Sequence, residues 1–448
     1  MAEVLQAGAT RLLAELVATT RWQDVPAAVR HETVRSFVNW LGCAVGGAPH
    51  PGVAAAMRAA TAYAGAPTAT LLGLGRRSDP VAAALVNGVS SHVLDYDDTH
   101  DGTLIHPSSP VLSAALALAE DRGASGVALL EAFLMGVEAA CRVGMAISPA
   151  HYDAGWHITG TCGSIGAAAA AARLLCLDAA RTAWAIGMGA SQPVGLRVHF
   201  GSMVKSFHPG RAAQNGILAA LLAAEGFDAA PDGIEGRRGF AEVLSSAYAP
   251  ERISEGLGTQ WEIMRNTYKP FACGLVVHPA IDLCLQLRAE RGFSLDAIEE
   301  VRLRVHPLVM DLTGKREPMS GLEGKFSIFH AAAVALVDGD GGEAEFSDAR
   351  VLAPEVVAMR RRVSATVEPG FKRTQCEVVL RLRDGSERRI ETTTPLGSLE
   401  KPMSDEALGR KFLGLATPVL GADGAGRLLA AAWSAAERPD LGWVAAEG

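Results

Sequence analysis

The segment IEEVRLRVH, Ile298–His306, is the place where the pattern of the chain changes. Apolar and polar residues alternate along it, which is typical of a half-buried β-strand. Asp384-Gly385, further along, is a hairpin signal between two more such runs. The predicted strands are Ile298–His306, Arg361–Val367, Thr374–Leu382 and Arg388–Thr394. Together with helices predicted at His278–Arg291 and Phe329–Val337, they indicate a small α+β domain over residues 268–397.

On both sides of this domain, apolar residues recur with the spacing of helices instead. The predicted helices there are Ala7–Thr19, Pro26–Cys43, Val111–Arg122, Gly126–Ile147, Ser164–Leu175, Ala179–Ser191, Gly210–Glu225, Asp405–Leu415 and Gly424–Ala436. The predicted fold is therefore mainly α. Residues 1–267 and 398–448 build one large all-helical domain from both chain ends, and residues 268–397 form a smaller, inserted α+β lid domain. Clefts between domains are common ligand sites.

The composition limits the classes of function. With 448 residues, of which 49% are hydrophobic, the chain can form a large core without disulfides. A net charge of −8 argues against a nucleic-acid partner. The seven cysteines are scattered without a CxxC motif, which favours reduced thiols in the cytoplasm over a metal cluster. The N-terminal segment resembles an amphipathic helix and not a signal peptide, and no apolar run is long enough to span a membrane.

A polar segment, SHVLDYDDTHDGTLIHPSSP at residues 91–110, lies between two apolar helical runs. It holds three histidines and four aspartates: His92, His100, His106, Asp95, Asp97, Asp98 and Asp101. These residues can cap helices and satisfy backbone donors without doing chemistry. Neighbouring carboxylates and imidazoles also shift one another's pKa values, as acid–base catalysis requires. The segment alone supports the two interpretations equally.

Further titratable residues occur in separate motifs. His157 precedes a Gly/Ala-rich helix, Lys205 and Arg211 lie in GSMVKSFHPGRAAQNG, and Lys269 and His278 lie in TYKPFACGLVVHPAID. Each of them alone is explained more simply as a cap, a core residue or a surface residue. Taken together they indicate a metal-free site for a small polycarboxylate. Lysines and helix N-termini would bind the carboxylates, and an imidazole or carboxylate would move protons.

Two other classes of function compete with this interpretation. A metal-dependent hydrolase could use Asp95, Asp97, Asp98 and His100 as ligands of a hard cation. Against it, the chain has neither a glycine-punctuated calcium loop nor an HExxH motif. A non-catalytic helical binding protein would suit the helix-rich composition with few aromatic residues. It would not need the several clusters of His, Lys and Asp.

Several long motifs, in order, resemble those of the MmgE/PrpD family, which includes 2-methylcitrate dehydratase-like proteins, cis-aconitate decarboxylase and iminodisuccinate epimerase. The motifs are NGVSSHVLDYDDTHDGTLIHPSSPVLSAALALAE, GWHITGTCGSIGAAAAAARLL, KSFHPGRAAQNGILAALLAAEGF, NTYKPFACGLVVHPAID, GKFS and KPMSDEALGRKF. The resemblance covers nearly the whole chain. It implies a large helical domain with a smaller α+β lid, and a homodimer.

The resemblance also implies the chemistry and the residues. It implies a metal-independent lyase, without a cofactor, that moves a proton next to a carboxylate of a di- or tricarboxylic acid. A 2-methylcitrate dehydratase-like reaction is the first expectation, and a cis-aconitate-type decarboxylase or an iminodisuccinate-type epimerase are alternatives. The family's site positions fall on Asp95, Thr99, His106, His157, Lys205 and Lys269.

We expect particular roles for these residues. His106 transfers the proton, with Asp95 orienting it or serving as partner base. Lys205 and Lys269, assisted by His157, stabilise an enediolate-like dianion. The residues expected to bind the substrate are Thr99, Arg211 and His278.

Two features of the chain depart from the family pattern. The interval between Asp98 and His106 is longer than in the decarboxylase-like members. In those members a histidine follows the lysine-proline-aromatic segment, near the position of Gly274 in this chain. The resemblance therefore implies that a proton donor for decarboxylation is missing, or that His278 replaces it.

Overall fold

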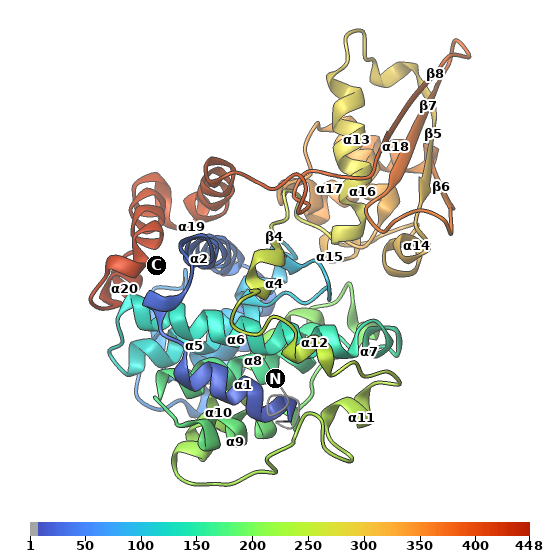
Figure 1. Cartoon of the computed structure of the whole chain (residues 1–448). Coiled ribbons are helices and arrows are strands. Elements are labelled where there is room, and N and C mark those ends of the chain that lie inside the picture. The colour runs from blue at the N-terminus through green and yellow to red at the C-terminus, as the bar shows by residue number, and fades with distance from the viewer. Residues whose placement is uncertain (1–7) are drawn as a thin grey trace.

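The computed structural model describes residues 8–448, and the first residue of the helix predicted at Ala7–Thr19 lies outside this range. Figure 1 shows a large helical body and a smaller part that carries the main sheet. The helices of the body are α1 (Ala9–Thr19), α2 (Ala27–Gly47), α3 (Pro51–Ala60), α4 (Pro80–Val93), α5 (Ser108–Asp121), α6 (Gly126–Ile147), α7 (Ala150–Asp153), α8 (Ile158–Leu174), α9 (Ala179–Ala190), α10 (Val204–Ala224), α11 (Phe240–Leu244), α12 (Glu251–Ser254), α19 (Asp405–Trp433) and α20 (Gly442–Glu447).

The smaller part combines helices with a four-stranded sheet. Its elements are α13 (His278–Ala289), β5 (Ile298–Val305), α14 (Pro307–Thr313), α15 (Gly321–Gly324), α16 (Ile328–Val337), α17 (Asp348–Val351), α18 (Pro354–Arg362), β6 (Val363–Val367), β7 (Cys376–Leu382) and β8 (Glu387–Thr392). The strand order is β6-β5-β7-β8, with β5 and β6 parallel and the other pairs antiparallel. Helices α13, α16 and α18 pack against the sheet (Figure 1). The four strands predicted from alternation, and the hairpin at Asp384-Gly385, are confirmed within two residues at each end.

The fold is mainly α, as predicted, and its body is built from both ends of the chain. Helix α19 returns from the sheet-bearing part to pack along α2 (Figure 1). It is broken at Gly421, where φ is 73°, so that it consists of the two predicted helical runs. The proposed boundaries at residues 267/268 and 397/398 stay a prediction.

Small residues bring the central helices of the body into close contact. Every residue of α8 from Ile158 to Ala172 is buried, and α8 packs against α5, α6, α9 and α10. Where α4 crosses α10, a Cβ on Gly88 would lie 2.4 Å from the Cα of Gly210. Backbones that approach this closely leave no room for a side chain, and overpacking a well-packed core destabilises it.

We therefore expect Gly88→Ala to lower the free energy of unfolding by about 1–3 kcal/mol, because α4 and α10 must move apart. Gly414 in α19 is the matched control, since a Cβ there meets nothing within 4 Å. Gly414→Ala should instead stabilise the helix by up to about 1 kcal/mol. Urea denaturation followed by circular dichroism measures both. Equal stability of Gly88→Ala and the unsubstituted protein would contradict the close packing.

Helices α8 and α10 each begin six residues earlier than predicted, and α5 begins at Ser108, three residues before the predicted Val111. Helix α8 begins at Ile158 and not Ser164, and α10 begins at Val204 and not Gly210. Pro209 lies in the second turn of α10, near its N-terminus, where the missing N–H removes one intrahelical hydrogen bond. The short pairs β1 (Ala69–Leu71) with β2 (Arg76–Ser78), and β3 (Thr99–His100) with β4 (Asn266–Thr267), were not predicted.

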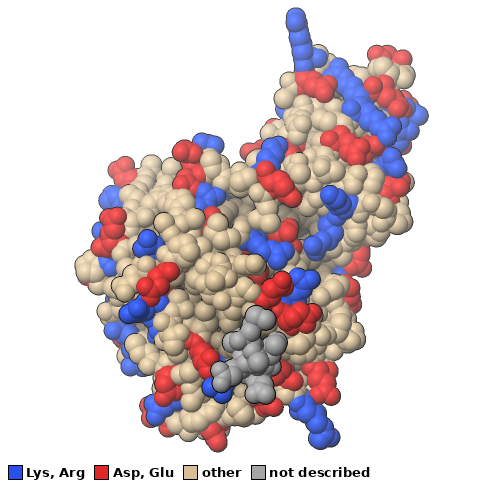
Figure 2. Space-filling view, viewed as in Figure 1, with Lys and Arg blue, Asp and Glu red and all other residues tan. Residues whose placement is uncertain are grey.

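On the face shown in Figure 2, acidic and basic side chains are interspersed over the helical body. Among residues 8–448, the structure contains no helix with both the length and the hydropathy needed to cross a bilayer.

Candidate active site

A buried cavity lies where the polar segment 91–110 meets the start of the sheet-bearing part, and we call it the central cavity. Its volume is about 470 Å³, including the opening to solvent. The lining residues are Asp95, Thr99, Leu104, His106, Tyr152, His157, Phe200, Lys205, Lys269, Gly274, Leu275, Val276, Leu312, Thr313 and Phe326. Six of the predicted site residues, from four separate motifs, therefore meet in one place.

Asp95 holds the two lysines of the cavity together. Its Oδ1 accepts hydrogen bonds from Lys205 Nζ and Lys269 Nζ, each at 2.8 Å, and its backbone carbonyl accepts a second one from Lys269 Nζ at 2.9 Å. Asp95 adopts a φ of 50°, a conformation that Asp and Asn tolerate better than most residues. All three side chains are nearly inaccessible to solvent. The carboxylate thus fixes two ammonium groups at one wall of the cavity.

His92, in the last turn of α4, forms hydrogen bonds with both Asp97 and Lys205. Its Nδ1 lies 2.7 Å from Asp97 Oδ2, and its Nε2 lies 3.0 Å from Lys205 Nζ. Although burial raises the pKa of Asp97, the neighbouring imidazoles of His92 and His106 lower it below its ordinary value. Ionised Asp97 can only accept, so His92 donates from Nδ1 and accepts from Lys205 at Nε2.

His106 is oriented by backbone and by a hydroxyl. Its Nδ1 lies 2.7 Å from the carbonyl oxygen of Asp98 and 3.2 Å from Thr99 Oγ1. A carbonyl only accepts hydrogen bonds, so Nδ1 carries the proton and Nε2 keeps its lone pair. Nε2 has no partner among the described residues and is left for the cavity that His106 lines. This tautomer suits a general base.

His157 is the N-cap residue of α8, as its position before the Gly/Ala-rich run predicts. Its Nδ1 lies 2.9 Å from His208 Nδ1, and its Nε2 is buried without a hydrogen-bond partner in the protein. A buried nitrogen without a partner is costly unless a ligand or water satisfies it. His157 Nε2 is therefore available to form a hydrogen bond with a ligand or water in the cavity.

Burial controls the protonation states of these groups. It lowers the pKa values of His106 and His157 well below the ordinary range, and nearby Lys205 lowers them further. Burial also lowers the pKa of Lys205, which Asp95 partly restores. Burial would raise the pKa of Asp95, but the two lysines hold it well below its ordinary value. At neutral pH the cavity therefore combines neutral imidazoles with an ionised Asp95.

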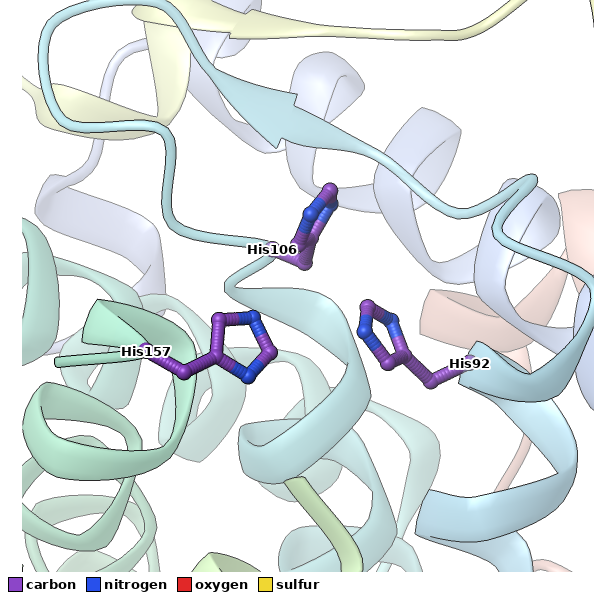
Figure 3. A group of neighbouring side chains, drawn as sticks. All are labelled: His92, His106 and His157. Atoms are coloured by element: carbon purple, nitrogen blue, oxygen red, sulfur yellow. The ribbon is translucent and has the colours of Figure 1, made fainter. Parts of the chain in front are cut away.

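Three imidazoles of the site are close enough to be considered as metal ligands. One ring nitrogen from each of His92, His106 and His157 lies within 4.8 Å of the others, and the rings face a common space in Figure 3. However, Lys205 Nζ lies 3.0 Å from His92 Nε2 and donates a hydrogen bond to the lone pair of that nitrogen. An ammonium group at this distance repels a cation and competes for the ligand atom.

The ligand set considered for a metal-dependent hydrolase is not assembled in the described residues. Asp95 is bound to the lysines. Asp98 accepts from Ser108 and Asn266, and His100 pairs with Glu262. Each group has its own partners, so these carboxylates and His100 do not converge on one point.

Three of the expected groupings are not seen in the structure. Arg211 is exposed, bonds to Gln214 and does not line the central cavity. His278 lines a neighbouring cavity with Lys372 and Arg373 and is not among the residues that line the central cavity. Asp95 has no hydrogen bond to His106, whose orientation comes from the Asp98 carbonyl and Thr99. In each case sequence proximity to a motif did not fix the direction of the side chain.

The local sequence predicts neither the contact of His92 with Asp97 nor the position of Phe200 and Phe326 in the cavity. The five-residue spacing of His92 and Asp97 is too common to be a signal, since their contact depends on the turn after α4. Phe200 and Phe326 come from segments far apart in the chain and lie over Lys205 Nζ, at 5.4 and 5.5 Å from the ring centroids. Nothing in their local sequence indicates this.

Buried neutral histidines also make stability depend on pH. Burial lowers the pKa of His278 from 6.5 to about 3. Between these values the unfolded chain binds the proton and the folded chain does not, so acidification favours unfolding. On going from pH 7 to pH 5, the free energy of unfolding should fall by about 2 kcal/mol less in His278→Gln than in the unsubstituted protein. Urea denaturation at the two pH values measures this, with exposed His31→Gln as control. An unchanged pH difference in His278→Gln would contradict it.

The fold and the site define a mainly helical protein with a buried acid–base centre made of lysines, histidines and an aspartate. Comparison with known families agrees with this class. The models of the MmgE/PrpD N-terminal domain and the MmgE/PrpD C-terminal domain match residues 11–253 and 271–435. The chain belongs to the MmgE/PrpD family.

Three similar proteins have the same name, cis-aconitate decarboxylase. Cis-aconitate decarboxylase of Aspergillus terreus is 27% identical over 443 residues, covering 92% of this chain and 90% of the relative. Cis-aconitate decarboxylase of Homo sapiens is 30% identical over 364 residues, covering 78% and 75%. That of Mus musculus is 30% identical over 363 residues, covering 77% and 73%.

Proposed function

We propose that the protein is a metal-independent lyase that moves a proton at the carbon next to a carboxylate of a small polycarboxylic acid. The observation that carries the proposal is the meeting of Lys205, Lys269, His106 and His157 around one buried cavity. Cations fixed beside a carboxylate stabilise the enediolate that forms when the adjacent carbon loses its proton. His106 Nε2 is the base, because its lone pair is free and because burial, which lowers the pKa of His106, keeps the imidazole neutral.

The donors of the lysines suit one substrate carboxylate. An ammonium group has three N–H donors. Lys205 directs two donors to His92 and Asp95, and Lys269 directs two to the side chain and carbonyl of Asp95. One N–H of each lysine is left, which matches the two oxygens of a carboxylate.

Two lyase reactions fit this arrangement. In a decarboxylation, the C–C bond to the departing CO₂ supplies an electron pair to the substrate, and carbon then takes up a proton that comes from water. In a dehydration, His106 removes the proton, and hydroxide leaves from the neighbouring carbon with a proton as water. The relatives named cis-aconitate decarboxylase favour decarboxylation as the first candidate. An epimerase, which returns the proton to the opposite face, remains an alternative within the same site.

Proton NMR in deuterium oxide tests the proposal directly. The purified protein is incubated with cis-aconitate, citrate, 2-methylcitrate and iminodisuccinate. Loss of CO₂ or of water, together with deuterium exchange or incorporation at a carbon next to a carboxylate, is the expected result. Exchange without loss of a group indicates the epimerase. No exchange with any of these acids, together with tight binding of one, would indicate the non-catalytic binding protein instead.

Metal independence has its own test. We expect full activity after dialysis against a strong chelator, because the ammonium group of Lys205 opposes a cation at the three imidazoles. Metal content measured by plasma mass spectrometry should be far below one ion per chain. Activity lost on chelation and restored by zinc or another divalent cation would overturn this part of the proposal.

The assembly and the compartment stay predictions. The family resemblance predicts a homodimer, which light scattering after size-exclusion chromatography would detect as twice the mass of 46.7 kDa. The scattered, free cysteines are compatible with the predicted cytoplasmic location.

A further inference from the structure

The turn that follows α4, residues 94–96, is buried and is bound by three buried lysines. Lys325 Nζ donates to the backbone carbonyl of its first residue at 2.6 Å, Lys269 Nζ to that of the second at 2.9 Å, and Lys411 Nζ to that of the third at 2.6 Å. Among the described residues, no backbone N–H bonds to these three carbonyls. Buried carbonyls need a donor, so the lysines supply the donors that hold this turn.

Lys325 and Lys411 also bind a second segment, residues 269–272, which begins with the active-site lysine Lys269. Lys411 Nζ donates to the first carbonyl of this segment at 2.9 Å, and Lys325 Nζ donates to the last at 2.8 Å. Each of the two ammonium groups therefore connects this segment to the turn that carries Asp95. Because the connections lie on either side of Asp95 in the turn, they fix where its carboxylate meets the active-site lysine.

The two lysines come from motifs that have no role in the site as described so far. Lys325 lies in GKFS, directly after α15 in the sheet-bearing part, and Lys411 lies in KPMSDEALGRKF, in α19 of the helical body. Neither residue lines the central cavity. They therefore contact the backbone around the site and not a substrate bound in it.

The ammonium group of Lys411 is an expensive way to stabilise a fold. Its three partners are the two carbonyls and Asn39 Oδ1, at 2.7 Å, so none of them is a carboxylate. Burial lowers the pKa of Lys411 from 10.5 to about 8. Replacing buried charges by apolar residues is often neutral or stabilising. Precise placement of catalytic groups is a stronger reason for a lysine here, because a displacement of 1 Å can cost about 100-fold in rate.

We propose that Lys325 and Lys411 are positioning residues of the active site. They hold the turn that carries Asp95 in place, and so fix the carboxylate that directs Lys205 and Lys269 into the central cavity. This inference rests on the proposed function, and it adds to the site two residues that do not contact the substrate.

Steady-state kinetics with an acid that the NMR experiment shows to react give the first test. Methionine matches the length of the lysine stem but donates no hydrogen bond. We expect Lys411→Met to lower kcat/KM by about 10- to 100-fold. Arg410→Met removes the neighbouring, exposed cation of α19 and is the matched control, which should keep kcat/KM. Unchanged kcat/KM in Lys411→Met would overturn the proposal.

Lys325→Met acts on the same turn from the sheet-bearing part, so the test stays decisive if Lys411→Met does not fold. The same loss of kcat/KM is expected. Lys315→Met is its control, because Lys315 also forms an ion pair with a glutamate, Glu323, but at an exposed position. An equal loss in Lys325→Met and Lys315→Met would count against a specific effect on the turn.

Combination with Asp95→Asn distinguishes positioning from a merely structural role. If Lys411 acts through Asp95, Lys411→Met should lower kcat/KM by less than about 2-fold further once residue 95 is asparagine, because the effects of coupled residues are not additive. A further loss as large as in the single variant would show that Lys411 does not act through Asp95.

Crystal structures of Lys411→Met and Lys325→Met without ligand give a readout that does not depend on turnover. Asp95 Oδ1 lies 2.8 Å from both Lys205 Nζ and Lys269 Nζ, and at least one of these distances should exceed about 3.5 Å in each variant. Unchanged distances in both variants would refute the positioning role even in an active lyase. Absence of turnover with every acid would instead contradict the proposed function alone.

Discussion

His106→Ala is expected to lower kcat by at least about 100-fold while the fold survives. The substitution removes Nε2, the ring nitrogen whose lone pair is left free because Nδ1 donates to the Asp98 carbonyl. His92 Nε2 already accepts from Lys205, and His157 Nδ1 is paired with His208. The neutral His106 side chain is held at the cavity by a hydrogen bond to the Asp98 carbonyl. Removing this side chain therefore breaks no ion pair, and we expect the fold to survive.

The variant His106→Asn distinguishes the loss of the catalytic nitrogen from the loss of a hydrogen bond that stabilises the fold. An asparagine amide can donate to the Asp98 carbonyl as Nδ1 does, but it has no atom at the position of Nε2. Both variants should therefore lose turnover, while the asparagine variant keeps the stability of the unsubstituted protein. His31→Ala, at an exposed position, is the control for histidine removal. Near-normal kcat in His106→Asn would remove His106 from the mechanism.

Asp95→Asn is the second substitution with a large expected effect. Asparagine tolerates the φ of 50° and matches the shape of the side chain, so the change is mainly one of charge. The two lysines then face each other without a counter-ion, and breaking a buried ion pair costs about 3–5 kcal/mol of unfolding free energy. We also expect kcat/KM to fall by about 100-fold or more, because the ammonium groups lose their fixed positions.

The pH profile of Asp95→Asn gives a more specific signature. Burial lowers the pKa of Lys205, and the charge of Asp95 raises it. Without that charge the pKa of Lys205 falls further, so the ammonium is lost at a lower pH and the alkaline limb of kcat/KM moves to lower pH. Asp101→Asn, in the same segment but without an ion pair among the described residues, should leave the limb in place. A profile of Asp95→Asn that matches the unsubstituted protein would contradict the role of Asp95.

Periodicity was a good guide to the elements and a poorer guide to their ends. Helix α6 was predicted at its observed bounds, and β5 within one residue. The first turns of α8 and α10 were missed because Gly, Thr and Pro residues obscure the helical pattern there. The pair β3–β4 was missed because two-residue strands have no periodicity. That pair places Thr99 opposite Thr267, two residues before Lys269, and so helps to assemble the site.

The sequence by itself determined the mainly helical fold, the inserted strands and the six motif residues that line the central cavity. These follow from local spacing and from residue types that recur in order along the chain. Only the tertiary structure decided which atoms meet. It showed that Asp95 binds lysines and not His106, that His278 and Arg211 do not line the central cavity, and that Phe200 and Phe326 lie over Lys205. The reason is physical: charge balance and hydrogen-bond partners depend on distances between segments far apart in the chain, which no local pattern encodes.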